Sequence, residues 1–131
     1  MRAMLIIFFT GLLAVSGCST TDPVNMMGYA TRAYERAVRW GNLESAERFR
    51  REPADNWTPA IRERLGRVKV TGYEVINSTL EPDERHMSQT VRIKYYYDAD
   101  LVERTLRDEQ RWEYDPEIKQ WFLVSELPTF P

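Results

Sequence analysis

The chain has 131 residues, of which 43% are hydrophobic and 12% aromatic, enough for one packed domain and too apolar for wholesale disorder. Its net charge is −2 and its acidic and basic residues are interspersed, which excludes the basic footprint of a nucleic-acid-binding protein. One cysteine excludes an intramolecular disulfide, and one histidine disfavours a histidine-based metal site. We therefore expect no metal, no cofactor and no nucleic-acid partner.

The N-terminus differs in composition from the rest of the chain. Arg2 is followed by an uncharged run over residues 3–15, "AMLIIFFTGLLAV". As a helix it would cover roughly 20 Å, less than the ~30 Å hydrocarbon core of a bilayer. A positive start, a short apolar run and then small residues predict a secretory signal peptide. The alternative is a buried core helix, which would normally show a polar face.

The sequence "VSGC", residues 15–18, resembles the lipobox of bacterial lipoproteins. The resemblance implies cleavage before Cys18 and attachment of lipid to its thiol, so that the protein is anchored in a membrane. Ser19 follows where inner-membrane lipoproteins commonly have Asp, which implies the periplasmic face of the outer membrane of a Gram-negative bacterium. We expect a signal peptide over residues 1–17, a lipidated tether over 18–23 and a domain over 24–131.

Three helices are predicted at the start of this domain. Apolar residues at steps of three and four predict a helix over residues 24–40, and Gly41 suits a left-handed C-terminal cap. Asn42 then caps a short helix over residues 43–49. A Thr-Pro pair begins a third helix, which ends near residue 66.

From residue 68 the apolar period changes to two, which predicts strands. The first strand should bend or bulge at Gly72, where its apolar set changes face. Helices followed by an antiparallel meander predict an α+β fold, with N-terminal helices packed on a curved sheet of about four strands. The strands are expected at residues 68–81, 87–98, 101–114 and 119–127.

The turn lengths predict the register of these strands. A loop over residues 115–118 pairs Trp112 with Trp121. A two-residue turn at 99–100 sets Arg92 opposite Arg107, which is unfavourable, so a slip at that turn stays open. The other pairs predicted there are Tyr95–Arg104, Ile93–Leu106 and Val91–Asp108.

Two segments resemble the NTF2-like (cystatin-like) family: "YERAVRWGNLESAERF" at 34–49 and "RWEYDPEIKQWFLVSELPTF" at 111–130. The first is similar to the family's opening helix, break and second short helix, and the second to its closing hairpin. The resemblance implies a sheet that curls around the helices. The family contains isomerases, dehydratases, transport factors, secretion-system subunits and domains without activity, so the fold alone implies no function.

In NTF2-like enzymes, polar residues inside the curled sheet perform acid/base chemistry. The polar residues on the predicted core face are Arg104, Asp108 and Gln110, with the Tyr95 hydroxyl as a neighbour. Desolvation could raise the pKa of Asp108 and make it a base in a pocket. The alternative, which we favour, is that these residues are solvated or pair as Arg104–Asp108. No catalytic residue is assigned.

Tyr96 should face outward between two inward tyrosines and is a candidate interface residue, whereas Trp40 is expected in the core. We therefore expect a non-catalytic module that binds an envelope protein or supports envelope assembly. The alternative is a small apolar ligand-binding protein, or an enzyme, with a pocket centred on Asp108. A cavity walled by Asp108 or Arg104 would favour that alternative. A filled core with an aromatic patch around Tyr96 would favour the interaction module.

Overall fold

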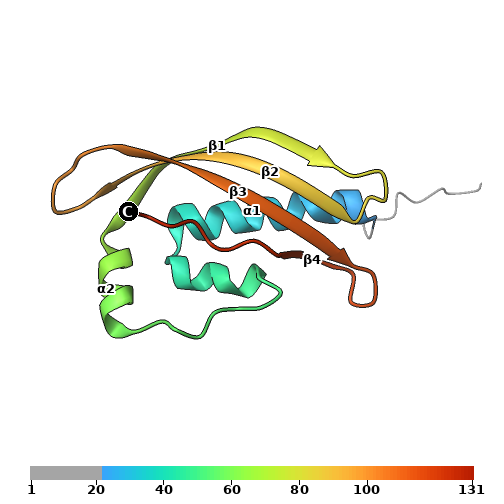
Figure 1. Cartoon of the computed structure of the whole chain (residues 1–131), viewed down its shortest axis with the longest axis horizontal. Coiled ribbons are helices and arrows are strands. Elements are labelled where there is room, and N and C mark those ends of the chain that lie inside the picture. The colour runs from blue at the N-terminus through green and yellow to red at the C-terminus, as the bar shows by residue number, and fades with distance from the viewer. Residues whose placement is uncertain (1–21) are drawn as a thin grey trace, which may run out of the picture.

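The domain is an α+β structure in which helices cover one face of a four-stranded antiparallel sheet of order β1-β2-β3-β4, as the sequence predicts (Figure 1). The computed structural model describes residues 22–131. The predictions of a signal peptide over 1–17, of lipid on Cys18 and of most of the tether lie outside these residues. The elements are α1 (Pro23–Trp40), a 3-10 helix η1 (Leu43–Phe49), α2 (Pro59–Gly66), β1 (Val68–Leu80), β2 (His86–Tyr97), β3 (Arg104–Asp115) and β4 (Gln120–Leu123).

The first helix begins one residue before the predicted start. The side chain of Asp22 accepts a hydrogen bond from the Val24 N–H at 3.1 Å, and Pro23 occupies the first turn, where its missing N–H costs nothing. Within residues 22–131, no helix is both long and apolar enough to cross a membrane. The α1 helix instead packs its buried side on the sheet through Tyr34, Ala37 and Val38.

The prediction of a left-handed cap at Gly41 is wrong, because this residue is extended, with φ −90°. Glycine serves a different purpose here. Its N–H donates to the Ala37 carbonyl at 3.2 Å, and a Cβ atom would lie only 2.9 Å from that oxygen. The chain therefore turns tightly against the last turn of α1. Asn42 then caps η1 as predicted, with its side chain accepting from the Ser45 N–H at 2.8 Å.

The β1–β2 pairing has two irregularities. The register shifts between Val70 and Gly72, where a bend was predicted, and again between Val75 and Asn77, which was not predicted. Bulges of this kind increase the local bend and twist of a sheet. The sheet accordingly arches over α1 (Figure 1).

The predicted β2–β3 register is confirmed, including Arg92 opposite Arg107. Each of these arginines has its own carboxylate partner. Arg92 contacts Glu74 of β1 at 3.1 Å, and Arg107 pairs with Glu109 on its own strand. On the opposite face Val91 and Ile93 are fully buried, and a slip of one residue would expose both. Burial on the inner face therefore determines the register, and the outer carboxylates relieve the repulsion.

The predicted β3–β4 register is wrong by two residues. Trp112 pairs with Leu123, and Tyr114 pairs with Trp121. The turn lies one residue later than predicted because the Asp115 side chain accepts from the Glu117 N–H at 2.9 Å, which keeps Asp115 as the last residue of β3. Since side chains alternate with a period of two, both tryptophans still reach the core.

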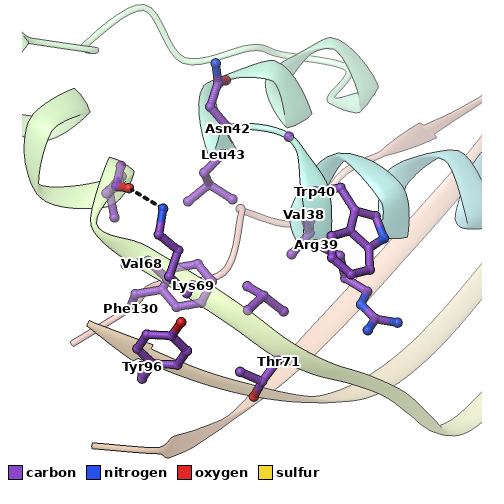
Figure 2. Close-up of a pocket in the computed structure, with 14 residues that line it drawn as sticks. Val38, Arg39, Trp40, Asn42, Leu43, Val68, Lys69, Thr71, Tyr96 and Phe130 are labelled. Carbon is purple, nitrogen blue, oxygen red and sulfur yellow. Dashed lines mark hydrogen bonds between the residues drawn. The ribbon is translucent and has the colours of Figure 1, made fainter. Parts of the chain in front are cut away.

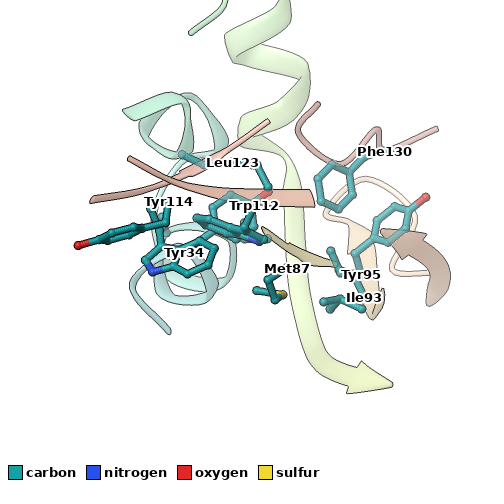
Figure 3. Packing of buried hydrophobic residues seen from close by; sticks show 13 residues of the cluster. Tyr34, Met87, Ile93, Tyr95, Trp112, Tyr114, Leu123 and Phe130 are labelled. Carbon is teal, nitrogen blue, oxygen red and sulfur yellow. The ribbon is translucent and has the colours of Figure 1, made fainter. Parts of the chain in front are cut away.

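Aromatic rings dominate the core (Figure 3). Tyr34 of α1 meets Trp112 of β3 edge to face, with ring centroids 5.4 Å apart, and meets Phe49 in the same way at 5.7 Å. At the other end Phe130 packs against Tyr95 at 4.9 Å. These T-shaped contacts join the helices, the sheet and the C-terminal segment into one core.

Replacing Gly41 by Ala should destabilise the domain by about 1–3 kcal/mol, because the added methyl group must push into the Ala37 carbonyl. Gly66→Ala is the matched control, since a Cβ atom there has no neighbour within 4 Å. It should be neutral or stabilise by about 0.4–1 kcal/mol through the unfolded chain. Urea denaturation measures both changes, and equal effects of the two variants would contradict this role of Gly41.

Candidate functional site

Gln110 lies at the centre of a buried network of polar side chains. Its amide nitrogen donates to the Asp108 carboxylate and to the Tyr73 hydroxyl, each at 2.8 Å. Its amide oxygen accepts from Gln89 at 3.2 Å and from the Trp112 indole at 3.1 Å. All four hydrogen-bonding positions of the amide are used, and the residue is only 1% exposed. The network is a filled part of the core.

Asp108 is the titratable group of this network. Burial is the main cause that raises its pKa to about 6, while the hydrogen bond from Gln110 acts against the rise. The hydroxyl of Tyr34 is buried nearby without a hydrogen-bond partner among the described residues, and burial and the Asp108 charge raise its pKa. Neither residue lines any of the four hollows described for residues 22–131.

The other two predicted pocket residues lie away from Asp108. Arg104 faces Tyr95 across the β2–β3 pair and binds both carboxylate oxygens of Asp100, at 2.7 and 3.1 Å. The Tyr95 hydroxyl donates to the Pro131 carbonyl at 3.4 Å. The structure thus brings Asp108 together with Gln110, and Tyr95 together with Arg104. The ion pair considered between Arg104 and Asp108 is replaced by Arg104–Asp100.

The candidate interface residue, Tyr96, lies in the wall of a hollow of about 420 Å³, which we call the Tyr96 hollow (Figure 2). This hollow opens between the end of α1, the start of η1, the end of α2 and the first residues of β1. Its wall is mainly apolar and aromatic. The larger side chains that line it are Val38, Trp40, Leu43, Leu65, Val68, Val70, Tyr96 and Phe130.

The placement of Trp40 in the core is wrong, because its side chain is 74% exposed at the rim of this hollow. The helical periodicity of α1 already indicates that Trp40 is exposed. Trp40 follows Arg36 by one turn and Arg32 by two, and both arginines are exposed. The remaining lining residues come from segments far apart in the sequence, so no local pattern could have grouped them with Tyr96.

The charged side chains that line the Tyr96 hollow are two cations, Arg39 and Lys69. Arg39 stacks over the Trp40 ring at 4.8 Å and reaches Glu35 at 3.7 Å, and its Nε atom is buried without an acceptor among the described residues. Lys69 Nζ donates to the Gly66 carbonyl at 3.4 Å (Figure 2). Both charged side chains of the lining are therefore cations, which suits a ligand that carries a carboxylate or another anion.

The Tyr96 hollow also borders an edge of the sheet. β1 is the first strand in the sheet order and pairs with β2 alone. Its residues Val68–Thr71 line the hollow, so backbone groups of β1 that the ladder does not use lie beside it. An extended peptide can bind such an edge by adding a strand.

One cluster outside the hollow has the composition of a metal site. Ligand atoms of Glu81, Asp83 and His86 lie within 4.8 Å of one another, and all three residues are exposed. The carboxylate of Asp83 contacts His86 Nδ1 at 2.6 Å, which raises the pKa of His86 and helps to lower that of Asp83. These contacts are those of an ion pair that closes the β1–β2 turn.

Comparison with known proteins supports the fold and does not identify a family. No protein-family model matches the chain, and no curated protein matches it. Among solved structures, a SEC-C motif containing protein from Psychrobacter arcticus is similar, with a TM-score of 0.57 and 13% identity. The match covers 97% of this chain and 78% of that protein. At this identity the likeness shows a shared fold alone.

Asp108→Asn should stabilise the domain above the pKa of the buried carboxyl. Because that pKa rises from 3.8 to about 6 on folding, ionisation of Asp108 costs stability, a loss that begins above pH 3.8 and is complete above about pH 6. The variant should therefore gain on the order of 3 kcal/mol near pH 8 and little near pH 4. Urea denaturation at both pH values measures this, and a pH-independent difference would contradict the buried-carboxyl assignment.

Proposed function

We propose that the protein is a lipoprotein anchored through Cys18 at the periplasmic face of the outer membrane, and that its domain binds another envelope protein without catalysis. One observation carries the choice of a binding module. The acid/base candidate Asp108 lies in the core beside Gln110, whereas the aromatic residue expected at an interface, Tyr96, lines an open hollow. This matches the arrangement that favours an interaction module over an enzyme centred on Asp108.

The wall of the Tyr96 hollow has the side chains that dominate protein interfaces. Tyrosine, tryptophan and arginine are enriched at such surfaces and supply much of the binding energy. Here Tyr96, Trp40 and Arg39 meet at one hollow, and Trp40 is already 74% exposed in the free domain. An indole that is solvated in the free protein gains burial when a partner covers it.

The proposed occupant is an extended, acidic segment of the partner. The free edge of β1 supports an extended segment, because its backbone groups can pair with a peptide. The two cations of the hollow, Arg39 and Lys69, support acidic side chains in that segment.

A small amphipathic anion is the second candidate for this hollow. Its volume of about 420 Å³ lies within the range of about 300–1,000 Å³ that is usual for small-molecule sites. Such a ligand would place its apolar body between Leu65 and Phe130 and its charge near Lys69. Mass spectrometry of molecules extracted from the purified protein separates this candidate from a peptide partner.

Metabolic labelling with a palmitate analogue tests the anchor. The wild-type chain should be labelled and should fractionate with the outer membrane, whereas Cys18→Ser should lose the label because the acceptor thiol is gone. Ser19→Ala is the matched control and should retain it. Equal labelling of wild type and Cys18→Ser would refute the lipoprotein assignment.

Photocrosslinking in membranes tests the docking site. A photoreactive residue in place of Thr71, which is exposed and lines the hollow, should give a defined protein adduct. Lys69→Glu should reduce that adduct several-fold, because it reverses one of the two charges that attract the partner. Arg111→Glu, the same change on an exposed residue of β3 outside the hollow, should leave it unchanged. An adduct of equal yield from Ser88, an exposed residue of β2 outside the hollow, would contradict a specific site there.

A further inference from the structure

A second surface, beside the start of α1, combines apolar side chains with arginines. It is a shallow hollow of about 390 Å³ between α1, η1 and β4. Its wall includes Met26, Tyr29, Phe49 and Phe122, together with Arg48. We call this surface the anchor-side face, and we include in it Arg32, which stacks on Tyr29.

Arginines stack on the aromatic rings of this face. The guanidinium of Arg32 lies 5.3 Å from the Tyr29 ring centroid, and that of Arg48 lies 4.9 Å from the Phe49 centroid. A guanidinium that stacks over an aromatic ring still has N–H groups at its own edge, and these can bind phosphate oxygens. The face therefore offers apolar contact and phosphate-binding groups side by side.

The exposed charged residues of α1 and η1 beside this face are arginines. Arg32, Arg36 and Arg48 are exposed and form no ion pair within residues 22–131. The one acidic residue of α1, Glu35, contacts Arg39. The exposed residues of α1 include no carboxylate; they are Asn25, Tyr29, Arg32, Arg36 and Trp40.

The anchor-side face lies where the chain leaves the domain towards Cys18. The indole of Trp121 in β4 donates to the Pro23 carbonyl at 2.7 Å, which fixes the first residue of α1 beside this face. Met26 and Tyr29 follow within two helical turns. If Cys18 carries the lipid of the proposed function, the five residues from there to Pro23 span about 17 Å at most. The face is then within reach of the lipid headgroups.

We propose that the anchor-side face binds the phosphate groups of the phospholipid surface that holds the anchor, and so orients the domain on the membrane. Arginine contacts with lipid phosphates and aromatic contacts at the interface are the chemistry such a surface requires. The Tyr96 hollow lies towards the opposite end of α1 (Figure 1). Met26 of the anchor-side face and Trp40 of the hollow are about 21 Å apart along the helix axis, so membrane and partner can be bound together. This inference rests on the proposed lipid anchor for its geometry and on the described arginines for its chemistry.

A fluorescent probe on the reconstituted, lipidated protein tests the orientation. Since lipid blocks Cys18, a cysteine introduced as Asn25→Cys is the one free thiol and can carry an environment-sensitive fluorophore. In vesicles of phosphatidylethanolamine with phosphatidylglycerol, its emission should rise several-fold over that in phosphatidylcholine vesicles, because only phosphatidylglycerol has a phosphate without a cation in the same headgroup. A probe at Ser88→Cys, on an exposed position of β2, should not respond.

Charge reversal separates a specific face from general attraction. Arg32→Glu with Arg48→Glu should abolish the rise at the Asn25 probe, and high salt should reduce it. Arg85→Glu with Arg111→Glu makes the same change in net charge at exposed arginines away from the face and should preserve the rise. Equal signals from both double variants, or crosslinking of this face to a protein, would overturn the inference.

Failure of the anchor gives a different result. If Cys18 carries no lipid, wild type and Cys18→Ser will float equally with vesicles. The face is then tested on Cys18→Ser by sedimentation with phosphatidylglycerol vesicles. Binding that falls several-fold in Arg32→Glu with Arg48→Glu supports the face without the anchor, and binding unchanged by that variant refutes it.

Discussion

The hydrogen bonds of the Gln110 side chain are the interaction on which the interior of this domain depends. This amide satisfies Asp108, Tyr73, Gln89 and Trp112 within a sheet face that is otherwise aromatic and aliphatic. Buried polar groups without partners destabilise a fold, so a network centred on one fully bonded amide is what allows a carboxyl to lie inside.

The two surfaces proposed for binding lie at the periphery of the domain. The Tyr96 hollow forms where α1 ends and the edge strand β1 begins, and the anchor-side face forms where α1 begins next to β4. Both combine aromatic rings with cations, and they lie towards opposite ends of α1. We infer that the surface near the start of α1 binds the membrane and that the surface near its end binds a partner protein.

The pairing of β2 with β3 was predictable because the apolar residues of their inner faces recur with a period of two. Val91, Ile93 and Trp112 are buried at a period of two, and this outweighs the contact between Arg92 and Arg107 on the outer face. The β3–β4 pairing was not predictable to the same degree. There a side-chain hydrogen bond of Asp115 shifts the turn by one residue, and a period-two pattern does not distinguish registers that differ by two.

The candidate site was also predictable only in part. Strand periodicity predicted that Asp108 and Gln110 share the core face. It also predicted that Tyr96 points away from the side faced by its inward neighbours. The grouping of Tyr96 with Trp40, Arg39 and Lys69 did not follow from it, because residues from α1, β1 and β2 meet there only after the sheet has arched over the helix.

The sequence by itself determined the elements, their order and which side of each strand is buried, because these depend on local periodicity and capping. It also predicts the lipid anchor, since a lipobox is a local pattern around Cys18. Only the tertiary structure decided that Asp108 is buried with a hydrogen bond from Gln110 and that the open hollow lies around Tyr96. The physical reason is that enclosure depends on how bulges bend the sheet and on which distant side chains then fill its interior.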